Sequence, residues 1–348
     1  MKNHFILKIK ESFAIALACL LLIVMSGCSG TNSVNSKDTV ASPDTAAEQP
    51  LEKVSIMLDW YPNAVHSFLY AAQKNGYFTK HGLDVDIQMP ADTNDALKLV
   101  AAGKIDLALS YQPQVLMARG DAIPVKSIAA IVRHPLNHLM VPEESGIQSP
   151  KDLVGKKIGY SSIPLYEAMM RTMIKHDGGD SQNVDMIDVG FSFIPAISTH
   201  KVDAIIGGFI NHEQLLLAKE GHPMTAINPT DFGVPDYYEL VLVASDDGLK
   251  NKQERFKRFI AAVTEGQHFV EQNTEDALAI LFQHEDGSSP MDQEIEKKSL
   301  NILKPLMNAG DAAFGYQDES SWAKVRDWLV ANELLPSGIK AEDAFLNL

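Results

Sequence analysis

The chain has 348 residues, a formal net charge of −15, and 45% hydrophobic and 22% charged residues. That length is enough for one large domain or two smaller ones with buried cores, and the composition is ordinary for a globular protein. The acidic balance argues against a nucleic-acid partner, because phosphate binding needs a basic surface.

Residues 1–27 have the features of an export signal and are set aside from the fold. Three lysines in MKNHFILKIK precede an apolar run from Ser12 to Met25, which is shorter than the roughly 20 residues of a membrane-spanning helix. The Met-Ser-Gly sequence before Cys28 resembles the lipobox of bacterial lipoproteins. This resemblance implies cleavage before Cys28, a lipid on its sulfur, and an extracytoplasmic protein anchored to the cell membrane. An ordinary signal peptide or a short anchor is the alternative.

The body that follows has no cysteine, since Cys19 and Cys28 are the two cysteines of the chain. It therefore has no thiol for a disulfide, a metal or nucleophilic catalysis. Residues 28–50 are rich in Ser, Thr, Asp, Ala and Pro and have few apolar side chains to bury, which predicts a flexible tether.

Short apolar runs then alternate with helical stretches, in the order typical of parallel sheets covered by helices. In chain order, strands are predicted at residues 54–58, 83–89, 105–110, 125–132, 156–161, 184–189, 203–209 and 240–245. Helices are predicted at 66–75, 92–102, 112–120, 164–176 and 212–221, and then at 254–272, 275–282, 293–306 and 320–332. This order predicts an α/β fold.

Two similar strings indicate that the alternating segment forms two lobes of the same kind. GKIDLAL (103–109) and HKVDAII (200–206) each place Lys, an apolar residue and Asp before a strand that ends in polar or aromatic residues. The alternation pauses at residues 143–150, and the chain becomes helical after Ser245. We therefore expect a first lobe of residues 51–142 and 246–348, a second lobe of residues 143–245, and a ligand cleft between them.

Polar and aromatic residues follow the predicted strands. Ligands of open α/β sheets bind beyond the carboxyl ends of the strands, so these residues are candidate ligand contacts. The candidate contacts are Asp59, Trp60, Asn63, His66, Tyr111, Ser161, Asn211, Tyr237, Tyr238 and Glu239. Only one of the two adjacent tyrosines is expected to touch a ligand, because neighbours in an extended chain face opposite ways. The wider group of strand-end residues also includes Phe209, His212 and Glu213.

The strand-end group is rich in aromatic rings and carboxylates and has no Arg or Lys. A sulfonate, nitrate or phosphate would favour Arg, Lys or a glycine-rich loop, and a sugar would accept aromatics with carboxylates. A flat nitrogen heterocycle fits better, because Trp60 and a tyrosine can stack on the ring while Glu239 accepts from an exocyclic amine. Other roles stay open: a core position for Trp60, a helix cap for Asp59, a neutral helix-start role for His66 and a solvated position for Glu239.

No metal site or catalytic motif stands out. HPLNH (134–138) has two histidines four residues apart, but Pro135 argues against a helix that presents both to one metal. The sequence has no Walker loop, GxGxxG or GxSxG, and no spacing singles out a pair of carboxylates for acid–base catalysis. We therefore expect no cofactor and no catalytic residue.

Five segments together carry a family resemblance: LDWYPNAVHSFLYAAQKNGYFTKHGLDVDI, AAGKIDLALS, DLVGKKIGYSS, IIGGFINHE and VPDYYELVLVAS. They resemble the thiamine-pyrimidine precursor binding proteins of bacterial ABC transporters, a group shared with fungal thiamine-pyrimidine synthases. The resemblance covers residues 54–345 and implies a type II periplasmic-binding-protein fold, with two crossings between the lobes near residues 141–146 and 241–245. It also implies capture of N-formyl-4-amino-5-aminomethyl-2-methylpyrimidine, or a close analogue, for delivery to ABC permease and ATPase subunits.

Under this resemblance, Trp60 and one of Tyr237 or Tyr238 would hold the ring. Glu239 and Asp59 would then accept from its 4-amino group, and Asn211 or His66 would read the formamide.

The chain departs from the synthase branch at the residues that would carry its chemistry. The positions that match the fungal pyridoxal lysine and donated histidine are Ser110 and Gln114, and the segment that matches the cysteine cluster, DFGVPDYYEL, has no Cys. The resemblance therefore implies a binding protein and not an enzyme. A binder of another ligand, such as an alkanesulfonate, and a synthase-like enzyme are the alternatives.

Overall fold

The computed structural model describes residues 50–348 except 93–94, 162, 191 and 286–289. The expected export signal, the lipidation of Cys28 and nearly all of the tether fall outside the described residues. None of the helices in the described part of the chain is long and apolar enough to cross a membrane.

The first sheet has five strands in the order β2-β1-β3-β10-β4. Neighbouring strands β2, β1 and β3 are parallel, and β10 is antiparallel to both of its neighbours. All six residues of β10 are buried, as expected for a central strand covered on both faces. The strand bounds are β1 Glu52–Met57, β2 Leu83–Gln88, β3 Leu107–Ser110, β4 Val125–Val132 and β10 Leu240–Ser245.

The second sheet repeats this topology, with the order β7-β6-β8-β5-β9. Here β7, β6 and β8 are parallel, and β5 is the antiparallel strand beside β8 and β9. The bounds are β5 Leu139–Pro142, β6 Lys157–Tyr160, β7 Asp185–Asp188, β8 Ala204–Ile206 and β9 Met224–Ile227. The prediction of an α/β fold with two similar sheets is confirmed.

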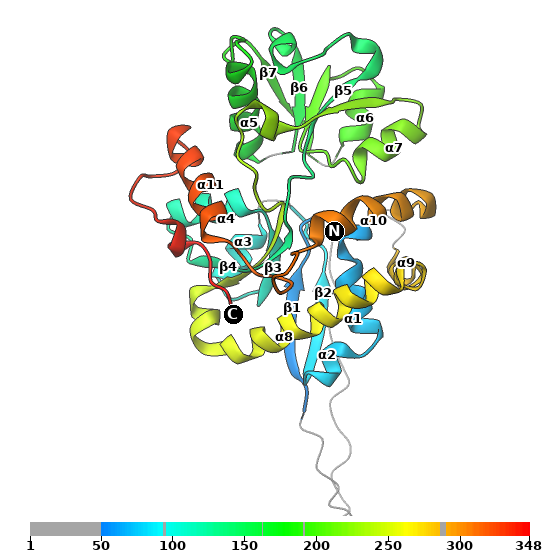
Figure 1. The fold of residues 1–348 in the computed structure, drawn as a ribbon, viewed down its shortest axis with the longest axis vertical. Helices are drawn as coiled ribbons and strands as arrows, with labels where there is room; N and C mark the ends of the chain where they lie inside the picture. The colour runs from blue at the N-terminus through cyan, green and yellow to red at the C-terminus, as the bar shows by residue number, and fades with distance from the viewer. Residues whose placement is uncertain (1–49, 93–94, 162, 191, 286–289) are drawn as a thin grey trace, which may run out of the picture. The chain divides into compact units, whose positions relative to one another are not determined.

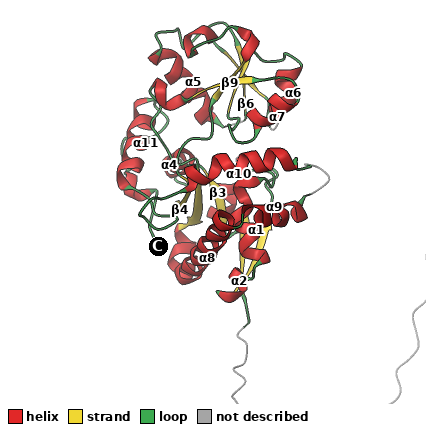
Figure 2. Ribbon diagram, turned by 45° about the vertical axis from the view of Figure 1, so that its right-hand side comes forward, coloured by secondary structure: helices red, strands yellow, loops and turns green. Residues whose placement is uncertain are grey.

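Helices cover both sheets. Figure 2 shows α5 on one side of strands β6 and β9, with α6 and α7 on the other. We call the first sheet with α1–α4 and α8–α11 the first lobe, and the second sheet with α5–α7 the second lobe (Figure 1). The helices are α1 Ser67–Lys74, α2 Tyr77–Lys80, α3 Ala96–Ala101, α4 Gln112–Gly120, α5 Pro164–His176, α6 Phe193–Ser198, α7 Glu213–Lys219, α8 Asp246–Gln272, α9 Thr274–Leu281, α10 Gln293–Met307 and α11 Glu319–Ala331.

The structure has α4 and α5 with the predicted bounds, whereas β5, β9, α2 and α6 were not predicted. These elements have only four to six residues each. Such short segments show too few repeats of a helix or strand period to stand out from their neighbours.

The chain crosses between the sheets earlier than expected. Strand β5 pairs in the second sheet and β10 in the first, so the crossings are residues 133–138 and 228–239. The expected crossings near 141–146 and 241–245, and the lobe boundaries drawn from them, are therefore wrong by several residues. The apolar pattern of LVLVAS predicts a buried strand, but it does not say which sheet supplies the hydrogen-bond partners.

Helices α1 and α8 approach each other closely at Gly266. A Cβ atom at this position would lie 2.2 Å from the carbonyl oxygen of Phe68 and 3.0 Å from the Cβ of Ala72. Only glycine leaves room for this contact between the two helices.

Gly266→Ala is therefore expected to destabilise the protein by about 1–3 kcal/mol through overpacking. The direction of the stability change tests the close contact, because alanine is otherwise favoured over glycine in a helix by about 1 kcal/mol. Urea denaturation measures the change, and the exposed Lys257→Ala on the same helix is the control. A gain in stability for Gly266→Ala would contradict the close packing.

Candidate ligand-binding site

A cavity of about 20 Å³ lies among residues that follow the parallel strands β1, β3, β6 and β8. This is the edge at which α/β sheets bind ligands. The first lobe contributes Asp59, Trp60, Asn63, Val65 and Tyr111, and the second lobe contributes Ser161, Tyr166, Gly207, Phe209, His212 and Glu213. The structure thus brings five of the candidate residues together here: Asp59, Trp60, Asn63, Tyr111 and Ser161.

Asp59 organises the first-lobe wall of the cavity. Its Oδ1 lies 2.9 Å from Nε2 of His66, and its Oδ2 accepts from the Tyr111 hydroxyl at 3.1 Å. The backbone N–H of Asn63 donates to Nδ1 of His66, so Nε2 carries the ring proton and donates to Asp59. Both Asp59 oxygens accept, which is the pattern of an ionised carboxylate.

His66 is therefore a neutral, fully buried residue that supports Asp59. It is not among the described residues that line the cavity. Asp59 is not the cap of the following helical turn. The Asn63 side chain has that role, because its Oδ1 accepts from the N–H of Val65 at 3.0 Å.

Glu213 and His212 form a charged pair on the second-lobe wall. Glu213 accepts from the Phe209 N–H at 2.8 Å, and its other oxygen lies 2.9 Å from Nδ1 of His212. Burial acts to lower the pKa of His212, but the carboxylates of Glu213 and Glu296 outweigh it and raise this pKa to about 9. Burial likewise acts to raise the pKa of Glu213, and the His212 cation holds it below its ordinary value. The pair is thus net neutral at pH 7, and Asp59 leaves the cavity negative.

Aromatic rings from both lobes border the cavity. Trp60 and Tyr111 from the first lobe and Tyr166 and Phe209 from the second line it. Phe193 is buried, and its ring centroid lies 6.5 Å from that of Trp60 with a 20° angle between the planes. Those of Tyr111 and Phe209 lie 6.2 Å apart in an edge-on arrangement. Burial, with the charge of Asp59, raises the pKa of Tyr111 well above its ordinary value, so its hydroxyl remains a donor.

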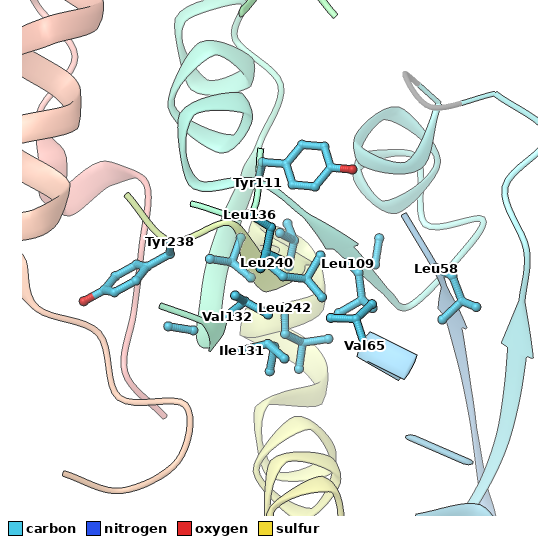
Figure 3. Packing of buried hydrophobic residues seen from close by; sticks show 14 of the residues in the cluster. Leu58, Val65, Leu109, Tyr111, Ile131, Val132, Leu136, Tyr238, Leu240 and Leu242 are labelled. Atoms are coloured by element: carbon cyan, nitrogen blue, oxygen red, sulfur yellow. The ribbon is translucent and has the colours of Figure 1, made fainter. Parts of the chain in front are cut away.

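The candidate residues Tyr237 and Tyr238 are both buried, and neither lines this cavity in the described part of the chain. The hydroxyl of Tyr238 accepts from the N–H of Asp318 at 2.8 Å, and its ring lies under the guanidinium of Arg133. Figure 3 shows the rings of Tyr111 and Tyr238 pointing away from each other on either side of Leu240. Tyr238 therefore faces the C-terminal segment, and Tyr237 lies beside Glu239.

Glu239 joins the two crossings to each other. Its Oε2 accepts the backbone N–H groups of Leu136 (2.8 Å) and Asn137 (2.9 Å) from the first crossing, and the Tyr237 hydroxyl at 3.0 Å. Glu239 is 1% exposed, which excludes the solvated position that the sequence left open. Burial raises the pKa of Glu239 to about 7, against the opposing effect of these hydrogen bonds, and the charge of Asp59 adds to the rise.

The remaining candidate residue, Asn211, contacts the first lobe. Its Nδ2 donates to Oγ of Ser299 on α10 at 2.9 Å, and both side chains are buried. Asn211 is thus placed behind the cavity wall.

The cavity-lining residues that were not chosen from the sequence are Val65, Tyr166, Gly207, Phe209, His212 and Glu213. Three of them, Phe209, His212 and Glu213, belong to the group of strand-end residues, so the signal for them was present. Tyr166 lies inside α5 on a buried face that reads as core, and nothing in the sequence distinguishes it from its neighbours.

A second cavity, of about 370 Å³, adjoins the first at Asp59 and Tyr111. Apolar side chains from β3, α3 and α4 make up much of its lining, together with Ile163 and Pro164 of the second lobe. Ser110 and Gln114 also line it, and the Ser110 hydroxyl donates to the Gln114 side-chain oxygen at 3.1 Å.

Two sheets joined by two crossings, with a cavity at the strand ends, define a two-lobe solute-binding fold. The chain has the same fold as the alkanesulfonate-binding protein SsuA of Xanthomonas axonopodis pv. citri, with a TM-score of 0.68 at 14% identity, covering 86% of this chain and 100% of that chain. The predicted binding-protein fold is thereby confirmed.

The sequence profile described as NMT1/THI5 like matches residues 63–277, and the chain belongs to this family. It is 42% identical over 339 residues to the formylaminopyrimidine-binding protein of Halalkalibacterium halodurans, covering 97% of this chain and 99% of that protein. It is 28% identical to a 4-amino-5-hydroxymethyl-2-methylpyrimidine phosphate synthase of Saccharomyces cerevisiae, covering 63% of this chain and 67% of that enzyme. The family resemblance read from the sequence is confirmed.

The raised pKa of Glu239 makes stability depend on pH. Its protonated form is favoured in the folded protein, so its stabilising contribution is complete below pH 4.5 and is lost as pH rises through about 7. Glu239→Gln cannot titrate. The variant is therefore expected to gain stability relative to the natural protein as pH rises across this window.

Thermal unfolding at a series of pH values measures the difference. Tyr237→Phe removes one donor to the carboxylate, and it should move the pH-dependent step to higher pH. A stability difference between Glu239→Gln and the natural protein that is constant from pH 4.5 to 8 would contradict the placement of a buried, titrating carboxyl at the crossings.

Proposed function

We propose that this protein is the extracytoplasmic solute-binding component of an ABC importer. It captures N-formyl-4-amino-5-aminomethyl-2-methylpyrimidine, or a close analogue, for salvage into thiamine biosynthesis. The observation that carries the proposal is a cavity with aromatic and carboxylate walls, in a chain 42% identical over nearly its full length to a formylaminopyrimidine-binding protein.

The chemistry of the cavity suits a neutral or cationic aminopyrimidine. No Arg or Lys occurs among the described residues that line it, and its one cationic group, His212, is paired with Glu213. A sulfonate would lack an unpaired cation to bind. A ring amine, in contrast, finds acceptors in Asp59 and Glu213, and Trp60 offers a face for stacking.

These contacts revise the roles expected from the sequence. Glu213 replaces Glu239 as the second carboxylate, and Phe209, rather than Tyr237 or Tyr238, is the second-lobe ring that lines the cavity together with Trp60. Ser161 and Tyr166 replace Asn211 and His66 as the groups that read the formamide, because Asn211 and His66 are not among the described residues that line the cavity.

The lobes separate to admit the ligand. A volume of about 20 Å³ holds about one water molecule, which is too little for a pyrimidine ring. The crossings at residues 133–138 and 228–239 are the segments about which the lobes rotate. The lobes then close around the ligand and this ligand-bound form docks on the permease, while the lipid on Cys28 keeps the protein at the membrane.

The protein binds its ligand without converting it. The two positions that match the lysine and histidine of the synthases hold Ser110 and Gln114, which are hydrogen-bonded to each other. Neither side chain can form the imine or supply the imidazole of that chemistry.

Calorimetric titration of the purified protein with the formylaminopyrimidine tests the proposal, and saturable one-to-one binding is expected. Trp60→Ala should weaken binding roughly tenfold or more, since stacking on one base contributes about 1–3 kcal/mol. Glu213→Gln should cause a similar loss, because a hydrogen bond to a charged group contributes about 1.5–3 kcal/mol.

The exposed Tyr316→Ala and Glu275→Gln are matched controls that should leave the affinity unchanged. Binding of ethanesulfonate in place of the pyrimidine would favour the alternative ligand class. Turnover of pyridoxal phosphate with iron would favour the synthase alternative. Either result, without pyrimidine binding, would sink the proposal.

A further inference from the structure

Helix α10 belongs to the first lobe, where it packs against the turn that begins at Ala64 and against α9. Polar side chains of α10, and of the N-cap residue directly before it, also contact the second lobe. The positions are spaced four and three residues apart, so they share one face of the helix. The contacts are Asp292 with Lys219, Glu296 with His212, and Ser299 with Asn211.

The three contacts differ in burial. The Lys219–Asp292 pair is well exposed, and such pairs contribute little to the free energy of holding two surfaces together. Glu296, in contrast, has a side chain 2% exposed, and its Oε1 lies 3.7 Å from Nε2 of His212. The Glu296–His212 contact is therefore the least screened electrostatic attraction along this face.

Glu296 also fixes the first-lobe wall. Its Oε2 accepts from the backbone N–H of Ala64 at 2.6 Å. Ala64 directly follows Asn63, whose N–H holds the His66 ring that supports Asp59. One carboxylate thus contacts the turn behind Asp59 and, across the cleft, the histidine paired with Glu213.

We propose that Glu296 is a positioning residue that couples closure of the lobes to the arrangement of both cavity walls. It does not line the cavity, and it acts through Ala64 on one side and through His212 on the other. The inference rests on the proposed function in one respect, which is that the cavity is the ligand site.

The Glu296–His212 attraction forms only when the lobes close. When the lobes separate, His212 remains paired with Glu213 in the second lobe, and Glu296 still accepts from the N–H of Ala64 in the first lobe. Burial raises the pKa of Glu296, and the His212 cation is the largest influence against that rise. The two charges therefore stabilise each other in the closed form.

A double-mutant cycle on the full chain tests this coupling. Glu296→Gln keeps an oxygen that can accept from Ala64 and removes the charge, and His212→Gln removes the cation. Cys19→Ser and Cys28→Ser leave a chain without cysteine. Spin labels are then placed at Lys104→Cys and Lys201→Cys, which are exposed positions before β3 and β8.

Pulsed spin-label distance measurements on the ligand-free protein give the ratio of closed to open forms. Each single variant is expected to lower this ratio about three- to tenfold, and the double variant should lower it no further than the larger single effect. Glu275→Gln is the control, because its pair with Lys297 of α10 lies within the first lobe. An unchanged ratio in Glu296→Gln, or additive effects in the double variant, would overturn the inference.

Calorimetry with the formylaminopyrimidine separates this inference from the proposed function. If the variants open but no form binds the pyrimidine, the coupling stands and the proposed function fails. If the pyrimidine binds but the cycle is additive, the proposed function stands and Glu296 is only structural. If both hold, the affinity falls by the same factor as the closed fraction, with a faster dissociation rate.

Discussion

The buried carboxylate of Glu239 joins the two chain segments on which the relation between the lobes depends. It accepts N–H groups from Leu136 and Asn137 of the other crossing. Asn137 in turn accepts from the N–H of Gly207, which lines the cavity. A single acid therefore fixes the crossings and, through one further residue, part of the second-lobe wall. Burying such a group is unfavourable unless it is hydrogen-bonded. Its pKa is raised because the effect of burial exceeds the opposing effect of the hydrogen bonds.

Paired polar groups also form the walls of the cavity. Asp59 is held by His66 and Tyr111, and Glu213 is held by His212 and a backbone N–H, so each carboxylate is fixed before a ligand arrives. Groups fixed in advance lose little freedom on binding. The two carboxylates come from different lobes, so a ligand that contacts both favours the closed form.

Family membership and fold together narrow the function more than either does alone. The fold is shared with an alkanesulfonate-binding protein at 14% identity, which leaves the ligand open. The side chains at the strand ends distinguish between ligand classes, because a sulfonate needs cationic or N–H donors, whereas the ring amine of an aminopyrimidine needs acceptors. The synthase relatives share the family, and the sequence resemblance matches their reactive lysine and histidine to Ser110 and Gln114, whose side chains bond to each other.

The sequence alone determined the α/β class, which follows from local periodicity and the order of elements, and the family, which follows from its motifs. It also predicted that the ligand site lies at the strand ends. Five of the ligand contacts that it predicted line the cavity, because they directly follow their strands or the turn after them: Asp59, Trp60, Asn63, Tyr111 and Ser161. Only the tertiary structure decided the contacts of Glu239, Asn211, Tyr238, His212 and Glu296. Their partners lie about 80 to 100 residues away in the chain. Such pairing depends on which sheet a strand joins and on how α10 meets the second lobe, and no local pattern records either.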